Sequence, residues 1–173
     1  MRNKLTLVIG GAGSGKSSWA ENLVIKSGYE KTYVATAQPW DDEMRAKIDR
    51  HQLQRGQNWH TIEAPLDISA PLAEANPDHI VLLDCATMWL SNHLLAGSVM
   101  AEEEARFIDA ITTCPAPVVV VTNEVGLSVV PENAMARQFR EAQGRLNQGI
   151  AAKADLVVAV MAGLPLVLKG QLR

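Results

Sequence analysis

The stretch Gly10–Ser17 reads GGAGSGKS, and it decides the fold of this chain. It satisfies the pattern G-x-x-x-x-G-K-[ST], in which the glycines let the backbone point successive N–H groups at phosphate oxygens. The apolar run LTLVIG before it is typical of a buried strand, and SSWAENLVIK after it favours a helix. This strand–loop–helix context predicts a phosphate-binding loop rather than a glycine-rich turn that matches by chance.

Two residues of this loop have distinct expected roles. Lys16 should reach the β- and γ-phosphates, and the Ser17 hydroxyl should bind Mg²⁺. A third group fits the same site, because HIVLLD ends in Asp84 at the carboxyl end of an apolar strand, where an aspartate can hold Mg²⁺ directly or through water. Asp84 is also suited to cap a helix, since a helical pattern begins just after it. The presence of the loop favours the metal role.

Outward from the loop, short apolar runs alternate with longer amphipathic segments. This pattern is typical of a mostly parallel sheet covered by helices. Strands are predicted at Leu5–Ile9, Thr32–Ala35, Ile80–Asp84, Val118–Thr122 and Leu156–Val160, with a further strand around Ile62. Helices are predicted at Lys16–Lys26, Asp42–Arg55, Ile68–Ala75, Thr87–Leu95, Glu102–Thr112 and Glu132–Ala152. Pro131 and Glu132 are expected to start the last helix.

The C-terminal run LVLK follows a break at Ala162–Pro165 and predicts an antiparallel edge strand. We therefore expect an α/β fold of the P-loop NTPase (RecA-like) class. Its mostly parallel central sheet would be flanked by helices and would end in that antiparallel edge strand. The 173 residues predict a single nucleotide-binding domain over residues 1–173.

Composition narrows the possible partners and the compartment. A net charge of −3 provides no overall basic field to hold nucleic acid, so an anionic partner should be a small molecule bound at a local site. No apolar stretch approaches the ~20 residues of a membrane span, and the N-terminal run is too short for a secretory signal. The only cysteines, Cys85 and Cys114, suit a reducing compartment, although one disulfide remains open. We expect a soluble, cytoplasmic protein.

A phosphate loop does not define the reaction. A GTPase would need the guanine motif N/T-K-x-D, but TNEV at Thr122–Val125 lacks both the lysine and the aspartate. The residues alone favour a small-metabolite kinase. A non-catalytic, nucleotide-dependent switch is the alternative from a different class.

The predicted helix Asp42–Arg55 carries a row of cationic side chains. Lys47, His51 and Arg55 recur at i, i+4 and i+8 and so share one face. Flanking cations would favour the neutral, nucleophilic form of the His51 ring. A solvated charged face fits the same pattern. The other histidines are weaker candidates, and His93 is expected on a surface helix.

Four stretches carry a resemblance to a known family. They are GGAGSGKS, YVATAQPWDDEMRAKIDRHQLQRGQNWHTIEAP, LLDCATMWLSN and VVVVTNEVGLSVVPENAMARQFREAQGRLNQGIAAKADLVVAVMAGLPLVLKG. On these motifs the chain resembles the bifunctional adenosylcobinamide kinase / adenosylcobinamide-phosphate guanylyltransferase family of cobalamin biosynthesis. The stretches occur in the family's order and cover most of the chain. Only Asp67–Asn76 and Leu95–Thr113 lack a distinctive match.

The resemblance implies two steps on one acceptor, with GTP and ATP as substrates and Mg²⁺ as cofactor. A nucleoside triphosphate first phosphorylates the aminopropanol hydroxyl of adenosylcobinamide. GTP then forms a covalent guanylyl-histidine with loss of pyrophosphate, and the GMP passes to adenosylcobinamide phosphate. By motif position the nucleophile falls on His51, and Lys16 is the second catalytic residue. The resemblance also implies a homo-trimer.

The family's other site residues are transferred by the same motif positions. Its nucleotide contacts fall on Gly10, Gly11, Ala12, Gly13, Ser14, Gly15, Lys16, Ser17, Thr36, Ala37, Gln38, Gln52, Leu53, Gln54, Arg55, Glu63 and Asp84, and its metal ligands on Ser17 and Asp84. Glu63 is expected to accept hydrogen bonds from guanine. Two positions depart from the family, which commonly has arginine at position 13 and often glutamate at position 84. These departures remove a charge near the phosphates and shorten the acidic side chain.

Polar residues after the Val118–Thr122 strand are further candidates. Asn123 and Glu124 lie where α/β sheets place ligand-binding residues, and they are expected to sense the γ-phosphate or to orient the acceptor hydroxyl. A tight strand exit without function is the alternative. Three arginines of the long helix are suited either to a substrate phosphate or to a neighbouring subunit; they are Arg137, Arg140 and Arg145.

Overall fold

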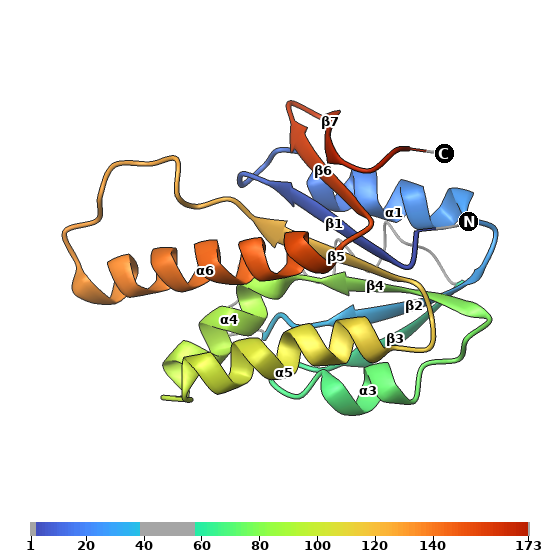
Figure 1. Ribbon diagram of the computed structural model, residues 1–173, viewed down its shortest axis with the longest axis horizontal. Coiled ribbons are helices and arrows are strands. Elements are labelled where there is room, and N and C mark those ends of the chain that lie inside the picture. Colours follow the sequence, from blue (N-terminus) through green and yellow to red (C-terminus); the bar gives the residue numbers. More distant parts are fainter. Residues whose placement is uncertain (1–2, 39–57, 173) are drawn as a thin grey trace.

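A seven-stranded sheet forms the centre of the computed structural model, which describes residues 3–38 and 58–172. The strands are β1 (Leu5–Gly10), β2 (Glu30–Ala35), β3 (Trp59–Glu63), β4 (His79–Asp84), β5 (Val118–Asn123), β6 (Leu156–Met161) and β7 (Leu164–Lys169). Their order across the sheet is β3-β2-β4-β5-β1-β6-β7. All neighbouring pairs are parallel except β6 and β7, which run antiparallel. Figure 1 shows this arrangement.

The predicted strands are confirmed with small shifts at their ends. The central strands are buried on both faces, as their uninterrupted Val, Leu and Ile runs indicate. The weaker signal around Ile62 corresponds to β3, a strand at one edge of the sheet. The C-terminal LVLK run lies within β7 at the other edge, where it pairs antiparallel to β6 as expected.

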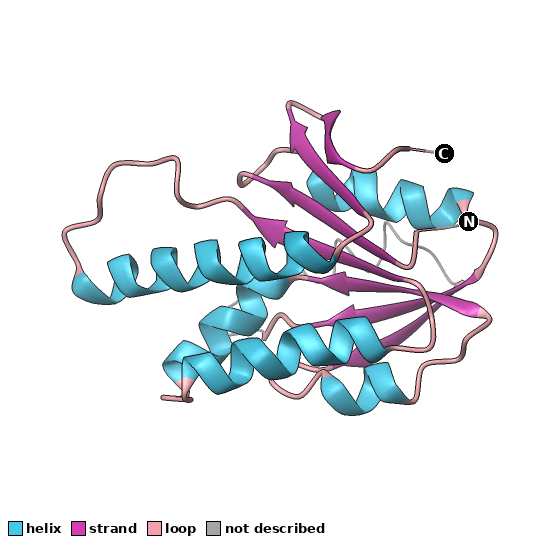
Figure 2. Cartoon of the chain, viewed as in Figure 1, coloured by secondary structure: helices cyan, strands magenta, loops and turns pink. Residues whose placement is uncertain are grey.

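Helices cover both faces of the sheet (Figure 2). One face of the sheet carries a single described helix, α1 (Lys16–Lys26). The other face carries α3 (Ser69–Ala73), α4 (Ala86–Leu95), α5 (Met100–Thr113) and α6 (Ala134–Lys153). These ranges confirm the predicted helices, apart from Asp42–Arg55, which lies outside the described residues.

The sheet separates two hydrophobic cores. Successive residues of a strand point to opposite faces, so Leu83 joins one core and Leu82 the other. The larger core, beneath α3 to α6, contains Trp89 and Phe107. The smaller core lies beneath α1 and contains Val24.

Two predictions about helices are wrong in detail. The long helix does not start at Pro131 and Glu132, because Asn133 caps it: its Oδ1 accepts hydrogen bonds from the N–H groups of Met135 and Ala136 at 2.8 and 3.3 Å. An asparagine side chain reaches these first-turn N–H groups, and this capping defines the start of the helix.

His93 is buried rather than placed on a surface helix. Only 6% of the residue is exposed, and its ring packs against Trp89 at an interplanar angle of 54°, with ring centroids 4.5 Å apart. The ring nitrogens lie 3.0 Å from Ser98 Oγ and 3.1 Å from the Leu66 carbonyl oxygen. The helix α4 is enclosed by the loop before α3 and by α5, so its polar positions are buried together with the apolar ones.

Two further findings bear on the cysteines and on membranes. Both Cys85 and Cys114 are buried free thiols, so the disulfide left open by the sequence does not form. In the part of the chain that the structure describes, no helix is both long enough and apolar enough to cross a membrane.

Candidate nucleotide-binding site

The carboxyl ends of the parallel strands bring the predicted site residues to one edge of the sheet. Gly10 at the end of β1 lies opposite Asn123 at the end of β5. Ala35 at the end of β2 lies opposite both Asp84 of β4 and Glu63 of β3. This edge is where open α/β sheets bind ligands, and we refer to it below as the phosphate edge.

The loop Gly10–Ser17 connects β1 to α1 at the phosphate edge. Ser14 N–H donates to the Gly11 carbonyl at 3.2 Å and closes a tight turn. Gly15 is the N-cap of α1 and supplies no side-chain acceptor to the first turn of the helix. A helix N-terminus behind a glycine-rich loop is suited to bind an anion, because its N–H groups and its dipole both favour negative charge.

Close contacts explain two of the loop glycines. A Cβ atom on Gly10 would lie 2.6 Å from the Val160 carbonyl oxygen. Gly15 has φ of 87°, and a Cβ there would lie 3.2 Å from the Cα atom of Gly163. Gly163 N–H also donates to the Ser14 carbonyl at 2.8 Å, so the turn between β6 and β7 supports the loop from behind. Gly13 has φ of 68° but open space around it.

Lys16 and Asp84 both lie near Cys85 at this edge. Lys16 Nζ donates to the Gly11 carbonyl at 3.2 Å, within the loop. The pKa of the neighbouring Cys85 thiol is raised to about 12, mainly by burial and in part by the Asp84 carboxylate, while the Lys16 ammonium lowers it. Both charges are therefore close enough to act on the same thiol, which stays protonated.

Asp84 is not a helix N-cap. That position belongs to Cys85, whose Sγ accepts a hydrogen bond from the Met88 N–H at 3.4 Å. This finding removes the alternative role of Asp84 and leaves its half-buried carboxylate at the phosphate edge.

The residues present fit a magnesium ion. Ser17 is half-buried in the first turn of α1 and supplies a hydroxyl oxygen, while Asp84 supplies carboxylate oxygens. Mg²⁺ prefers oxygen ligands and usually takes only one or two from carboxylates, with water and phosphate completing its shell. Residues 3–38 and 58–172 contain no cluster of three acidic, histidine or cysteine side chains that would favour another metal.

Thr36 is fully buried just beyond β2. Its Oγ1 donates to the Cys85 carbonyl at 2.7 Å and accepts from the Cys85 N–H at 2.8 Å. Asn92 Nδ2 donates to the Thr36 carbonyl at 2.8 Å. In this structure Thr36 thus holds the backbone that follows Asp84, and Ala37 continues from it along the phosphate edge.

The remaining predicted contacts divide into two groups. Gln38 is half-buried after β2, and Glu63 is exposed at the end of the edge strand β3. Five predicted residues lie outside the described part of the chain; they are His51, Gln52, Leu53, Gln54 and Arg55.

A buried polar network surrounds the backbone of Asn123, and the sequence did not reveal it. Asn123 N–H donates to Thr87 Oγ1 at 2.8 Å, and Asn147 Nδ2 donates to the Asn123 carbonyl at 3.0 Å. Thr122 Oγ1 donates to Asn147 Oδ1 at 2.7 Å. Gln143 Nε2 donates to both Thr122 Oγ1 and Asn147 Oδ1, at 3.0 and 2.9 Å. Only the proximity of α4, β5 and α6 in the fold brings these residues together.

The three arginines of α6 have partners within the chain. Arg137 donates to the carbonyls of Pro131 and Glu132, and Arg140 donates to the Ser128 carbonyl. Arg145 forms an ion pair with Glu104 of α5 at 3.2 Å. The first two arginines therefore fasten the loop between β5 and α6 onto the helix.

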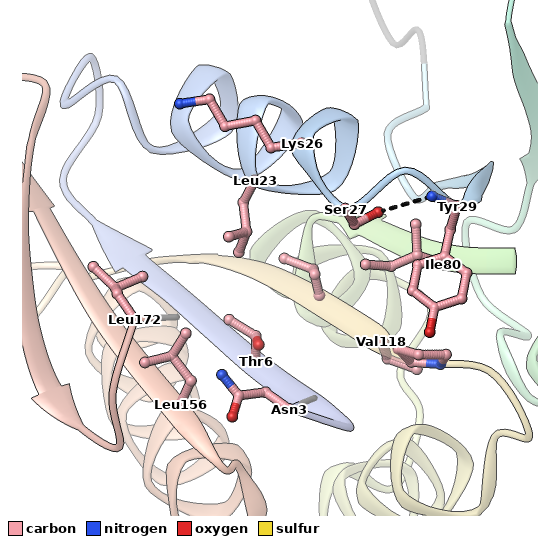
Figure 3. A pocket seen from close by; sticks show the side chains of 12 residues that line it. Asn3, Thr6, Leu23, Lys26, Ser27, Tyr29, Ile80, Val118, Leu156 and Leu172 are labelled. Atoms are coloured by element: carbon pink, nitrogen blue, oxygen red, sulfur yellow. Dashed lines mark hydrogen bonds between the residues drawn. The ribbon is translucent and has the colours of Figure 1, made fainter. Parts of the chain in front are cut away.

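A pocket of about 420 Å³ lies at the opposite edge of the sheet (Figure 3). Its floor includes Thr6, Ile80, Val118 and Leu156, which stand at the amino ends of their strands. This pocket is therefore separate from the phosphate edge.

Comparison with known proteins identifies a family whose members are similar to this chain. A family model described as cobinamide kinase / cobinamide phosphate guanyltransferase matches residues 6–168. The bifunctional adenosylcobalamin biosynthesis protein CobP of Pseudomonas aeruginosa is 40% identical over 168 residues, which is 95% of this chain and 97% of that protein. The bifunctional adenosylcobalamin biosynthesis protein CobU of Escherichia coli is 40% identical over 181 residues, with 95% and 99% covered.

Among solved structures, an ATPase of the type III secretion system of pathogenic bacteria matches with a TM-score of 0.58 at 9% identity. The match covers 95% of this chain and 56% of the ATPase. A structural match at such low identity shows the fold alone. The shared fold confirms the predicted P-loop NTPase fold class.

Proposed function

The chain belongs to the cobinamide kinase / cobinamide phosphate guanyltransferase family, and from this premise we propose how its phosphate edge serves both reactions. The observation that carries the proposal is the family match over residues 6–168, together with the loop Gly10–Ser17 and Asp84 at one edge of the sheet. The acceptor is adenosylcobinamide in the first step and its phosphate in the second.

In the kinase step, the loop Gly10–Ser17 binds the triphosphate of ATP or GTP. Its backbone N–H groups and the start of α1 hold the phosphate oxygens, and Lys16 neutralises charge on the β- and γ-phosphates. The acceptor hydroxyl attacks the γ-phosphorus, the bond to the β-phosphate oxygen breaks, and a nucleoside diphosphate leaves. The hydroxyl proton passes to solvent.

In the guanylyl transfer step, the His51 ring is the nucleophile. A ring nitrogen attacks the α-phosphorus of GTP and pyrophosphate leaves, which gives a guanylyl-histidine. A phosphate oxygen of adenosylcobinamide phosphate then attacks the same phosphorus and the ring nitrogen departs. Imidazole suits both halves because it is a competent nucleophile and a good leaving group.

Ser17 and Asp84 would hold Mg²⁺ at this edge, and their oxygen donors support this assignment. The ion, when bound, neutralises charge on the phosphates. Thr36 contributes indirectly, because its two hydrogen bonds to Cys85 fix the backbone next to Asp84. The pKa of about 12 keeps Cys85 neutral, so it adds no second negative charge beside the phosphates.

Glu63 is the proposed reader of guanine. It is an exposed carboxylate at the end of β3, in register with Ala35 of β2, which itself lies opposite Asp84. A carboxylate accepts hydrogen bonds from the guanine N1–H and N2–H₂ groups, and adenine presents no such pair of donors. This chemistry favours GTP over ATP.

The working assembly is proposed to be a homo-trimer in the cytoplasm. A chain of this size offers little surface to enclose a corrinoid ring, so the acceptor would lie in a groove completed by a second subunit. Two free thiols suit a reducing compartment. Sedimentation of the active enzyme tests the assembly, and a stable active monomer would contradict it.

The experiment for the whole proposal uses GTP labelled at the α-phosphorus. The protein is incubated with this GTP and Mg²⁺ and then denatured. Wild-type protein should retain an acid-labile, alkali-stable label, and His51→Ala should retain none. His60→Ala is the matched control, because His60 is an exposed histidine of β3, and it should be labelled like wild type.

Other outcomes separate the alternatives. Phosphorylation of adenosylcobinamide by a wild-type protein that never takes up the α-label would identify a plain kinase. Nucleotide binding without turnover of any acceptor would indicate a switch. Equal labelling of His51→Ala and wild type would assign the nucleophile to another residue.

A further inference from the structure

We infer that the hydrogen-bonded network around Asn123 positions its side chain at the terminal phosphate of the nucleotide, and that it serves the kinase step. The inference rests on the proposed function for its substrates. It adds positioning residues from α4, β5 and α6 that act through Asn123; these are Thr87, Thr122, Gln143 and Asn147.

The hydrogen bonds form a closed ring that begins and ends at Asn123. The N–H of Asn123 donates to Thr87 Oγ1, and Thr122 gives its hydroxyl hydrogen to Asn147 Oδ1. The Thr87 hydroxyl is then the donor in its 3.4 Å contact with Thr122 Oγ1. Asn147 Nδ2 returns to the Asn123 carbonyl. Each hydroxyl of the ring therefore donates its hydrogen to one defined acceptor. The ring also holds both the N–H and the carbonyl of Asn123 in hydrogen bonds.

The ring leaves the Asn123 side chain available. Its Oδ1 is buried and has no hydrogen-bond partner among the described residues. A buried polar atom without a partner costs free energy, and such atoms in native proteins often mark functional positions. The side chain is thus held in place by its backbone. Because Oδ1 accepts, its partner must be a donor such as the attacking hydroxyl, and the contact with the γ-phosphate falls to the Nδ2–H₂ group of the same amide.

The position of Asn123 identifies the ligand group. Asn123 lies opposite Gly10, the first residue of the phosphate loop, and Glu124 N–H donates to the Gly10 carbonyl at 3.0 Å. On the other side of β5, Asp84 lies opposite Val121. Asn123 therefore stands between the loop and the proposed metal ligand, where the γ-phosphate and the attacking hydroxyl meet.

The network is more than a means of filling the core. Thr122 and Gln143 are fully buried, and Gln143 Oε1 has no partner in the described chain. Apolar side chains of similar volume would fill this space without leaving a polar atom unsatisfied. The arrangement fits a requirement to hold one residue at a fixed place and orientation, as a reacting group needs.

The two reactions of the enzyme separate this role from a structural one. The kinase step breaks the bond between the β- and γ-phosphates, whereas guanylyl transfer breaks the bond between the α- and β-phosphates. A group at the terminal phosphate should affect kcat of the kinase and leave the rate of protein guanylylation nearly unchanged.

The test compares Thr87→Val, which removes the hydroxyl, with Thr87→Ser, which keeps it. Thr87→Val should lower kinase kcat about tenfold, with little change in the KM for nucleotide and less than about a twofold change in the guanylylation rate. Thr87→Ser should retain most of the kcat. Thr113→Val is the matched control: its hydroxyl bonds only within α5, at Asp109, and both rates should stay at wild-type values.

A second variant covers the case in which Thr87→Val does not fold. Asn123→Ala removes the side chain that the ring positions and keeps the ring's backbone partners, so it should show the same selective loss. Equal losses in both reactions, or losses that only follow the melting temperature, would overturn the inference. A wild-type protein that takes up no α-label would instead contradict the proposed guanylyl transfer, and the kcat and KM values of the kinase would still test the ring.

Discussion

Thr36 links two strands at the phosphate edge through a single hydroxyl. This group both donates to and accepts from the backbone of Cys85, in a fully buried position. Thr36→Val keeps the shape and removes both hydrogen bonds, which leaves a buried N–H and a buried carbonyl without that partner. We expect the free energy of unfolding to fall by about 1–3 kcal/mol, measured by urea denaturation.

The same change should also weaken catalysis, because the displaced backbone carries Asp84. Thr61→Val is the matched control, since Thr61 is exposed on β3, and its stability should change by less than about 0.5 kcal/mol. If Thr36→Val were as stable and active as this control, the positioning role of the Thr36 hydroxyl would be refuted.

Glu63 gives a second prediction for a single side chain. Glu63→Gln exchanges one carboxylate oxygen for an NH₂ group, which cannot accept from guanine. The preference for GTP over ATP should fall about tenfold, because hydrogen bonds to a charged group are stronger than neutral ones. The measurement is the ratio of kcat/KM values for the two nucleotides.

Glu30→Gln provides the matched comparison for Glu63. Glu30 is also exposed, but it begins β2 at the opposite edge of the sheet. This variant should keep the wild-type preference. A Glu63→Gln enzyme that still discriminates like wild type would remove Glu63 from guanine recognition.

At the scale of single residues, the sequence predicted those positions in the site that follow from a local sequence pattern. The motif GGAGSGKS follows the apolar run of one parallel strand, and Asp84 ends the apolar run of another. Because parallel strands align their carboxyl ends, the phosphate loop and Asp84 lie at the same edge of the sheet. The ring around Asn123 could not be predicted, since Gln143 and Thr122 are 21 residues apart in sequence and meet only after folding. His93 was misplaced because a histidine in a helix gives no sign of which loop will cover it.

At the scale of elements, boundaries were the least predictable feature. The central strands are buried on both faces, so their apolar composition marks them clearly. The start of α6 depends on which polar side chain caps it, and Asn133 was a stronger signal than Pro131 and Glu132. That capping role follows from a general preference and was available in the sequence.

The helix α6 contains an internal glycine whose effect on stability can be tested. Gly144 lies within it, and a Cβ atom there would meet nothing within 4 Å. Gly144→Ala should therefore stabilise the protein by about 0.5–1 kcal/mol, because alanine loses less backbone entropy in a helix than glycine does. Urea denaturation measures the change.

At Gly15, substitution by alanine should lower the free energy of unfolding rather than raise it. Its φ of 87° and the 3.2 Å approach of a Cβ atom to Gly163 Cα oppose any side chain, so Gly15→Ala should destabilise the protein by about 1 kcal/mol or more. The opposite signs distinguish glycines that the fold requires from one that it tolerates. A destabilised Gly144→Ala variant would mean that α6 is constrained at this position by something other than its own helical geometry.

At the scale of the whole molecule, the sheet divides the protein into two cores that each contain one thiol. Cys114 belongs to the core beneath α3 to α6, and Cys85 to the core beneath α1. Burial raises the pKa of both thiols, and the Cys85 value of about 12 leaves roughly 1 thiolate in 10,000 at pH 8. Since the thiolate is the reactive form, both thiols should react very slowly with an alkylating reagent in the native protein.

These thiols test whether the chain is one domain, as proposed from its length. Single-thiol variants, Cys85→Ala and Cys114→Ala, would be labelled at increasing urea concentration. Because every central strand contributes side chains to both cores, the two cores should open together, and the two thiols should become reactive at the same midpoint once each curve is corrected for that variant's stability. A Cys85 thiol that became reactive well before global unfolding, measured by circular dichroism, would mean that the layer carrying the phosphate loop opens as a separate unit.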